Sequence, residues 1–190
     1  INHIKALYAQ GYTANAEAYI HELQSRFPDY APYETGNQHI DTILFSLQQK
    51  MLESGIEFVI EGMLPPDIAV HPVDLSILLG NIFDNAIHEC LRVIGAANAK
   101  SESTSLHGAI KSPPTIVAVF RFSGKGLFVD ISNPTDKTDI NSAFANTERR
   151  GRGLGIVDDT LNTYNGIKDI KITKGRLHFS FYIQADRGNH

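Results

Sequence analysis

The 190-residue sequence lacks several features, and each absence limits the functions that the protein can have. It contains a single cysteine, Cys90, so no disulfide can form within the chain, and a reducing compartment is the simplest setting for it. No apolar run approaches the ~20 residues of a membrane-spanning helix, and no signal-peptide pattern opens the chain. A formal net charge of -4 gives no electrostatic reason to expect nucleic acid or an anionic membrane as a partner. We therefore expect no nucleic-acid partner and no direct membrane contact for this part of the protein.

Two widespread nucleotide-binding motifs are also missing. The sequence has no GxxxxGK[ST] pattern, which excludes a P-loop. The glycine cluster GRGLG at 151–155 does not fit the dinucleotide fingerprint, because Ile156 follows it and a polar segment precedes it where a strand should lie. Composition is otherwise that of an ordinary globular domain, with 42% hydrophobic and 20% charged residues.

Hydrophobic periodicity and turn residues divide the chain into helices and strands. The predicted helices are 2–10, 14–27, 37–54, 72–94 and 153–164, and the predicted strands are 56–62, 115–122, 127–132, 167–173 and 176–184. Residues 95–114 are rich in Ala, Ser, Asn and Lys without periodicity and are predicted to form a long loop, and 133–152 is a second polar segment.

The order of these elements predicts the fold class. Hairpin-like strand pairs alternate with single helices after residue 37, which favours an α+β two-layer sandwich with a mixed, mostly antiparallel sheet and helices on one face. A short helical hairpin precedes it. The turn-rich segment 28–36 suggests two domains, 1–33 and 34–190. The opening INHIKAL is already helix-like without Met or an N-cap, so we expect the chain to be part of a longer protein.

The stretch 78–89, LLGNIFDNAIHE, carries the first chemical signal. An apolar stripe along its helix predicts a core-facing side formed by Leu75, Leu78, Leu79, Ile82, Ala86, Cys90 and Val93. A polar stripe holds Asn81, Asn85, Glu89 and Arg92. Asparagine is a mediocre former of helix interiors, and amide oxygens suit Mg²⁺, so a functional role is one interpretation. An ordinary solvated helix face is the other, and it is the simpler one for the helix alone.

Two further stretches can each be interpreted as functional or as ordinary structure. The glycines of 151–155 open a predicted helix beside Arg149, Arg150 and Arg152, an arrangement that can hold phosphate but would serve equally as a tight turn. Asn133 follows Asp130 at a strand end, where its amide could pair with the Watson–Crick edge of a base. Asn-Pro is also an ordinary turn opener, which by itself is the simpler explanation.

Together the three stretches follow a known order: Asn-x-x-x-Asn-Ala on a helix, a strand ending in Asn or Asp, and a polar loop closed by GxGL. This order, over residues 37–184, resembles the GHKL superfamily of ATP-binding domains, which includes sensor histidine kinases, type II topoisomerases and mismatch-repair ATPases. The resemblance implies MgATP as ligand, Asn85 as magnesium ligand, Asn81 on the nucleotide side and 134–150 as the ATP lid. The implied catalytic residues are Asn81 and Asn85, and the implied nucleotide-binding residues are Asn85, Glu89, Asn133, Arg150, Gly151, Gly153 and Leu154.

The chain departs from the superfamily at the adenine-binding box. Asn133-Pro-Thr-Asp-Lys stands where Asp-x-Gly-x-Gly is usual, although an Asn oxygen can still accept from the adenine amino group. This pattern is similar to the histidine kinases that include peptide-pheromone quorum-sensing receptors. Residues 1–33 resemble that subgroup's truncated dimerisation hairpin, while Leu47 stands where the subgroup often has lysine.

The resemblance also favours a kinase over a hydrolase. In GHKL ATPases a glutamate one turn before the magnesium-binding asparagine activates water, and here that position is Asn81, which cannot take a proton at neutral pH. A histidine kinase implies transfer of the γ-phosphoryl to a histidine on the hairpin of a homodimer, and then to a response regulator. The implied full-length protein is a membrane-anchored bacterial receptor with this part in the cytoplasm.

The acceptor histidine is expected upstream of residue 1, because Asn2-His3 resembles the end of the acceptor pattern. His21-Glu22 imitates that pattern, but Pro28 stops its helix too early, so an exposed histidine is the better interpretation. Two alternatives stay open: a nucleotide-binding or dimerisation module without kinase activity, and a GHKL ATPase.

Overall fold

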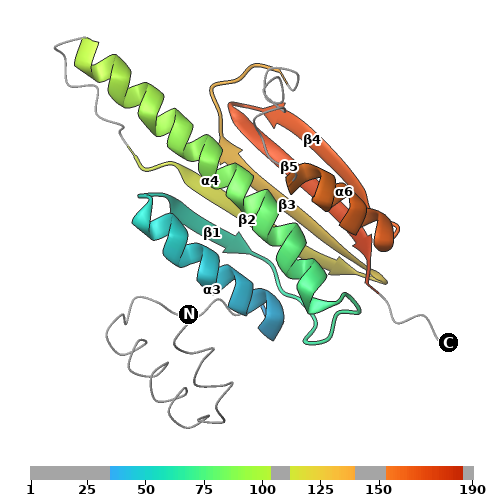
Figure 1. Ribbon diagram of the computed structural model, residues 1–190. Coiled ribbons are helices and arrows are strands. Elements are labelled where there is room, and N and C mark those ends of the chain that lie inside the picture. The colour runs from blue at the N-terminus through green and yellow to red at the C-terminus, as the bar shows by residue number, and fades with distance from the viewer. Residues whose placement is uncertain (1–34, 104–111, 140–152, 186–190) are drawn as a thin grey trace, which may run out of the picture. The chain divides into compact units, whose positions relative to one another are not determined.

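The computed structural model describes residues 35–103, 112–139 and 153–185, with the side chains of 97–103 excepted. Three helices and five strands lie in these residues (Figure 1). The helices are α3 (Gln38–Glu53), α4 (Pro72–Ser103) and α6 (Gly153–Thr163), and the strands are β1 (Glu57–Glu61), β2 (Thr115–Ser123), β3 (Gly126–Pro134), β4 (Ile167–Thr173) and β5 (Arg176–Gln184).

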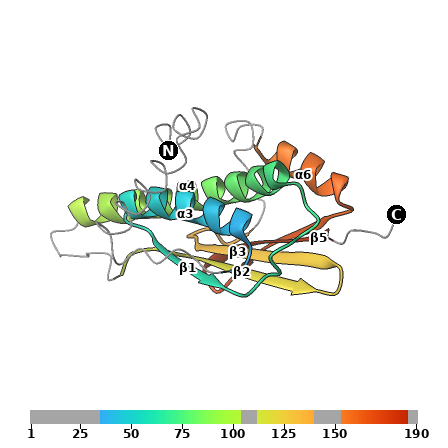
Figure 2. The ribbon, with the colours of Figure 1, turned by 90° about the horizontal axis from the view of Figure 1, so that it is seen from below.

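The five strands form one mixed sheet in the order β1-β2-β3-β5-β4. β1 pairs with β2 in parallel, and the other three pairings are antiparallel. All three helices lie on one face of this sheet, with α4 between α3 and α6 (Figures 1 and 2). The predicted α+β two-layer sandwich with a mostly antiparallel sheet is therefore confirmed.

The central helix α4 supplies most of the core on the helical side. Every member of its predicted apolar stripe is buried except Val93, which is partly exposed. Phe83 and Ile87 are buried as well, and α3 packs beside α4. The Phe83 ring meets Phe58 of β1 edge to face, with 5.3 Å between the ring centroids. α4 is thus held on two sides, which fixes the rotation of the helix about its axis.

The first half of the domain is tied together by Asn37. Its Oδ1 accepts from the backbone N–H of Ile40 at 3.1 Å and so caps the N-terminus of α3. Its Nδ2 donates to the carbonyls of Pro65 and Pro66 in the segment that leads to α4. α3 ends at Glu53 with Ser54 as its C-cap, and Gly55 follows with a φ of +65°, which favours glycine.

The prediction of a loop over 95–114 was wrong for its first half. α4 continues through Gly95 to Ser103. The alanines at 96, 97 and 99 and Lys100 are strong helix formers, and one glycine costs a helix only about 1 kcal/mol. Residues 104–111, and all of the predicted domain 1–33 with its helices 2–10 and 14–27, lie outside the described residues. Among the helices described, none has the length and apolar character needed to span a membrane.

Tyr164, just after α6, connects this helix to the start of α4. Its hydroxyl donates to the carboxylate of Asp74 and accepts from the backbone N–H of His71 at 3.0 Å. Burial raises the pKa of Tyr164, and the hydrogen bond to Asp74 raises it further, so the hydroxyl keeps its proton. These bonds hold the end of α6 at a fixed distance from the start of α4.

Replacement of Tyr164 with Phe should lower the free energy of unfolding by about 2 kcal/mol, because Asp74 loses a charge-assisted bond and His71 N–H its acceptor. Urea denaturation measures this value. Tyr182→Phe is the control: Tyr182 lies against Gly126 on the open face of the sheet, and its loss of a hydroxyl should change stability by less than about 0.5 kcal/mol. Equal urea midpoints of unfolding for the two variants would contradict this role of Tyr164.

Candidate functional site

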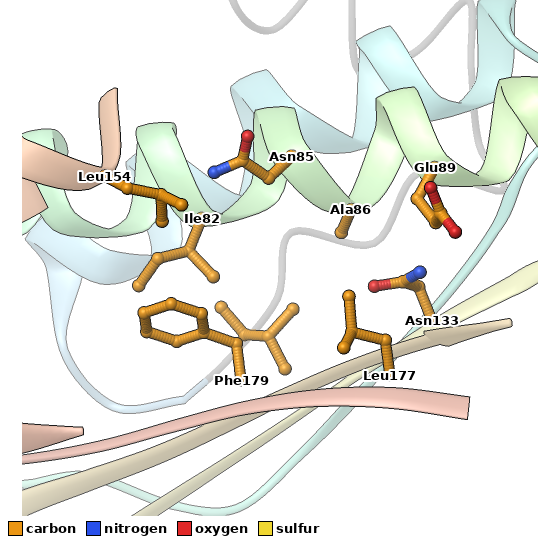
Figure 3. Close-up of a pocket in the computed structure, with 9 residues that line it drawn as sticks. Ile82, Asn85, Ala86, Glu89, Asn133, Leu154, Leu177 and Phe179 are labelled. Atoms are coloured by element: carbon orange, nitrogen blue, oxygen red, sulfur yellow. The ribbon is translucent and has the colours of Figure 1, made fainter. Parts of the chain in front are cut away.

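A small cavity between α4, α6 and the sheet contains several of the predicted site residues. Its walls come from four elements, as Figure 3 shows. The lining residues are Ile82, Asn85, Ala86 and Glu89 of α4, Ile131 and Asn133 of β3, Leu154 of α6, and Leu177 and Phe179 of β5. Residues far apart in the sequence, Asn85, Asn133 and Leu154, therefore meet at one place.

The cavity is apolar on most of its surface and small. Its polar side chains are Asn85, Glu89 and Asn133. The space open to the centre of a water molecule is about 20 Å³, which is room for about one water. A purine base would have to displace some of the apolar side chains that line the cavity.

Asn133 presents an acceptor to this cavity. It is 3% exposed and lies on the inner face of β3. Its Nδ2 donates to the carbonyl of Pro134 at 3.0 Å, which leaves Oδ1 directed toward Leu177 and the interior (Figure 3). An amide oxygen buried in this orientation suits a ligand group that donates a hydrogen bond, such as an exocyclic amino group. The strand extends through Asn133, so the residue has a fixed backbone instead of the turn that Asn-Pro alone would suggest.

Asn81 makes contacts that the sequence did not indicate. Its Nδ2 donates to the carbonyl of Ile77 at 2.7 Å, within its own helix. A Cβ placed on Gly153 would lie 2.7 Å from Asn81 Oδ1. The glycine therefore lets the first residue of α6 approach the Asn-rich face of α4. Arg150 and Gly151 lie outside the described residues.

Glu89 is the buried charge of the site, with a side chain 2% exposed. Its Oε1 accepts from Arg92 Nη2 at 2.9 Å and from the Thr135 hydroxyl at 2.6 Å. Its Oε2 accepts from Arg92 Nε at 3.1 Å and lies 3.6 Å from Lys137 Nζ. Arg92 also pairs with Asp136, with Nη1 3.1 Å from Oδ2. Burial alone would raise the pKa of Glu89, but the bonds from Arg92 and Thr135 and the two cations outweigh it and hold the pKa below 4.5.

The sequence showed only part of this network. Glu89 and Arg92 are three residues apart on one helix, which is a readable pair signal. Thr135, Asp136 and Lys137 follow β3, and their distance from α4 in the sequence hides the pairing until the fold is known.

Within the described residues, no group of three or more His, Cys, Asp or Glu side chains could hold a metal on its own. A magnesium ion at Asn85 would therefore depend on phosphate and water ligands, which is how Mg²⁺ usually binds with nucleotides. Asn85 is among the residues that line the cavity, and an amide oxygen is a ligand type that fits such a shared set.

A second groove lies on the opposite, open face of the sheet and holds Asp130, His178 and Ser180. Both His178 Nδ1, at 3.1 Å, and the Ser180 hydroxyl, at 2.6 Å, contact the Asp130 carboxylate. The carboxylate stands between serine and histidine, so the histidine is not placed to activate the serine as a nucleophile.

Comparison with known proteins identifies the fold. No family model matches the sequence, and no curated protein matches it. The nucleotide-free catalytic domain of histidine kinase ThkA matches with a TM-score of 0.58 at 14% identity, over 78% of this chain and 90% of that one. Acinetobacter baumannii histidine kinase AdeS matches with a TM-score of 0.53 at 11% identity, over 78% of this chain and 64% of that one.

Full-length ShkA in complex with AMPPNP matches with a TM-score of 0.55 at 17% identity, over 82% of this chain and 31% of that one. The chain thus spans about a third of the length of ShkA and nearly all of the ThkA catalytic domain. The fold is that of histidine kinase catalytic domains.

Gly153→Ala should lower the free energy of unfolding by about 1–2 kcal/mol, because the new Cβ would meet Asn81 Oδ1 at 2.7 Å. Gly155→Ala is the matched control in the same helix, where a Cβ meets nothing within 4 Å, and it should be neutral or stabilising. Adding Asn81→Ala to Gly153→Ala should restore part of the loss. Urea denaturation of all variants tests the contact, and an additive double variant would contradict it.

Glu89→Gln should destabilise the protein by about 2 kcal/mol at neutral pH, because Arg92 and Lys137 lose their buried anion. The folded-state pKa of Glu89 lies below the ordinary glutamate value, so its contribution to stability is present above the unfolded-state pKa and is lost as pH falls through the folded-state pKa. The stability difference between parent and variant should therefore narrow only in acid. Urea unfolding from pH 7 to 3 measures it, with exposed Glu53→Gln as a control that should show no such narrowing.

Proposed function

We propose that this chain is the ATP-binding catalytic region of a two-component sensor histidine kinase. The observation that carries the proposal is the meeting of Asn85, Asn133 and Leu154 around one cavity, on a fold shared with histidine kinase catalytic domains. The AMPPNP in the ShkA complex supports a nucleotide as the ligand.

In this proposal the adenine ring lies in the cavity between apolar walls, and its amino group donates to Asn133 Oδ1. Asn85 would hold the magnesium ion, and Gly153 and Leu154 at the start of α6 would face the phosphates. Arg150 and Gly151, outside the described residues, are phosphate contacts that the sequence resemblance implies. A helix N-terminus with nearby glycines favours phosphate oxygens there. Magnesium would neutralise phosphate charge when bound.

The proposed reaction is phosphoryl transfer and not hydrolysis. A neutral imidazole nitrogen of the acceptor histidine attacks the γ-phosphorus, the bond to the β–γ bridging oxygen breaks, and ADP leaves. The N–H proton on the other nitrogen of the phosphoimidazolium then passes to water. No base is required at position 81, where the amide nitrogen of Asn81 is bonded to Ile77. The acceptor would lie on the dimerisation hairpin of a homodimer, and an aspartate of a response regulator would receive the phosphoryl group next. The full-length protein would be membrane-anchored, with this region in the cytoplasm.

One observation favours a second candidate, a nucleotide-binding or dimerisation module without kinase activity. The cavity has room for about one water, and the adenine box has lost its glycines. A chain extended upstream to include the expected acceptor, incubated with γ-labelled ATP, separates the two. Acid-labile label on the protein supports the kinase, and ATP binding without label supports the second candidate.

Titration calorimetry with ATP, with and without Mg²⁺, tests the nucleotide site. ATP should bind the parent, and Mg²⁺ should tighten binding. Asn85→Ala should remove the effect of Mg²⁺ and weaken MgATP binding about tenfold or more, which is about 1.4 kcal/mol. His88→Ala, an exposed residue on the same helix, is the matched control and should bind like the parent. Absence of binding, or an Asn85→Ala variant that binds like the parent, would contradict the proposal.

A further inference from the structure

Glu89 lies on the wall of the cavity, yet its carboxylate is engaged by the protein itself. A carboxylate offers about four lone-pair positions, and four contacts from Arg92, Thr135 and Lys137 meet them. A nucleotide group that donated a hydrogen bond to Glu89 would have to displace one of these partners, and a phosphate would bring a second negative charge to a buried anion. The geometry thus argues against Glu89 as a direct ligand.

The same contacts hold the segment that follows Asn133. Thr135 is 9% exposed, donates its hydroxyl to Glu89 and accepts from the backbone N–H of Lys137 at 3.2 Å. The backbone N–H of Thr135 donates to the carbonyl of Gly175 at 2.9 Å, in the turn between β4 and β5. Asp136 pairs with Arg92 from outside. The chain is therefore fixed from α4 and from the β4–β5 turn within two residues of Asn133.

We infer that Glu89, with Arg92 and Thr135, forms a latch that positions Asn133 for recognition of the base. The inference rests on the proposed function and deepens it: Glu89 becomes a positioning residue that acts through Thr135. α4 then contributes two residues to the same cavity: Asn85 contacts the ligand, and Glu89 fixes the position of the end of β3 on the other side of the cavity.

A latch of this kind affects which base is accepted. Asn133 Oδ1 accepts from an amino group and repels a carbonyl oxygen, so it separates adenine from hypoxanthine only while its position is fixed. Loosening the latch weakens ATP binding and reduces the preference for ATP over ITP. A contact that served stability alone would lower the melting temperature and leave that preference unchanged.

Thr135→Val tests the latch, because valine keeps the shape of threonine and removes the hydroxyl that donates to Glu89. Calorimetry with ATP and with ITP, each with Mg²⁺, should show ATP binding weakened at least fivefold and the ITP-to-ATP ratio of dissociation constants reduced. Thr135→Ser retains the hydroxyl and should restore both. Should Thr135→Val not fold, Asp136→Asn at the exposed end of the network is the second variant, with a twofold to threefold weakening expected.

The outcomes distinguish the latch from the proposed function. Lack of ATP binding by the parent would overturn the proposed function. ATP binding by the parent, together with a Thr135→Val variant whose ATP affinity and ITP-to-ATP ratio equal those of the parent, would overturn the latch alone. A lower melting temperature with an unchanged ratio would also overturn it, since Glu89 would then contribute to stability only.

Discussion

The burial of α4 against the sheet and between its two neighbouring helices determines the rest of the structure. Because Phe83 packs against Phe58 of β1 while Ile82 and Ala86 line the cavity beside β3 and β5, the helix cannot rotate about its axis without exposing core residues. This constraint fixes the direction in which the remaining positions point. Asn81 meets the start of α6, Asn85 reaches the cavity, and Glu89 is buried opposite the end of β3. The burial of the apolar stripe of α4 therefore determines where its polar stripe lies.

A buried charge on such a helix needs partners, and the partners order the chain around it. Glu89 is stable without its proton because Arg92 on the next turn and Thr135 across the cavity donate to it. The segment after β3 is thereby fixed close to Asn133. A hydrophobic residue at position 89 would fill the same volume without this tie. The polar network thus connects the packing of α4 with the geometry of the proposed base site.

Much of the fold was predictable because it depends on local patterns. Alternation in β5 placed Phe179, Phe181 and Ile183 on the buried face, and Asn37 and Gly55 marked the ends of α3. The site was predictable in part: the four lining residues Asn85, Glu89, Asn133 and Leu154 came from the motif order, and the structure places them around one cavity. Their individual roles remain predictions.

The rest depends on contacts between distant parts of the chain. The bond from Thr135 to Glu89 joins residues 46 positions apart, and the close approach of Gly153 to Asn81 depends on how two helices pack. Neither contact produces a periodic pattern in the sequence. The end of α4 was missed for the opposite reason: a polar composition was interpreted as a loop although its alanines favour a helix.

In the proposed function, adenine nucleotide binds between α4 and β3, on the helical side of the sheet. The most direct test is a map of backbone amide chemical shifts during titration with MgATP, read at Asn85, Asn133 and Leu154 and, on the open face, at Arg121 and Lys171. We expect the largest shifts at the first three residues and little change at the other two. Largest shifts on the open face, or none at Asn85 and Asn133, would contradict it.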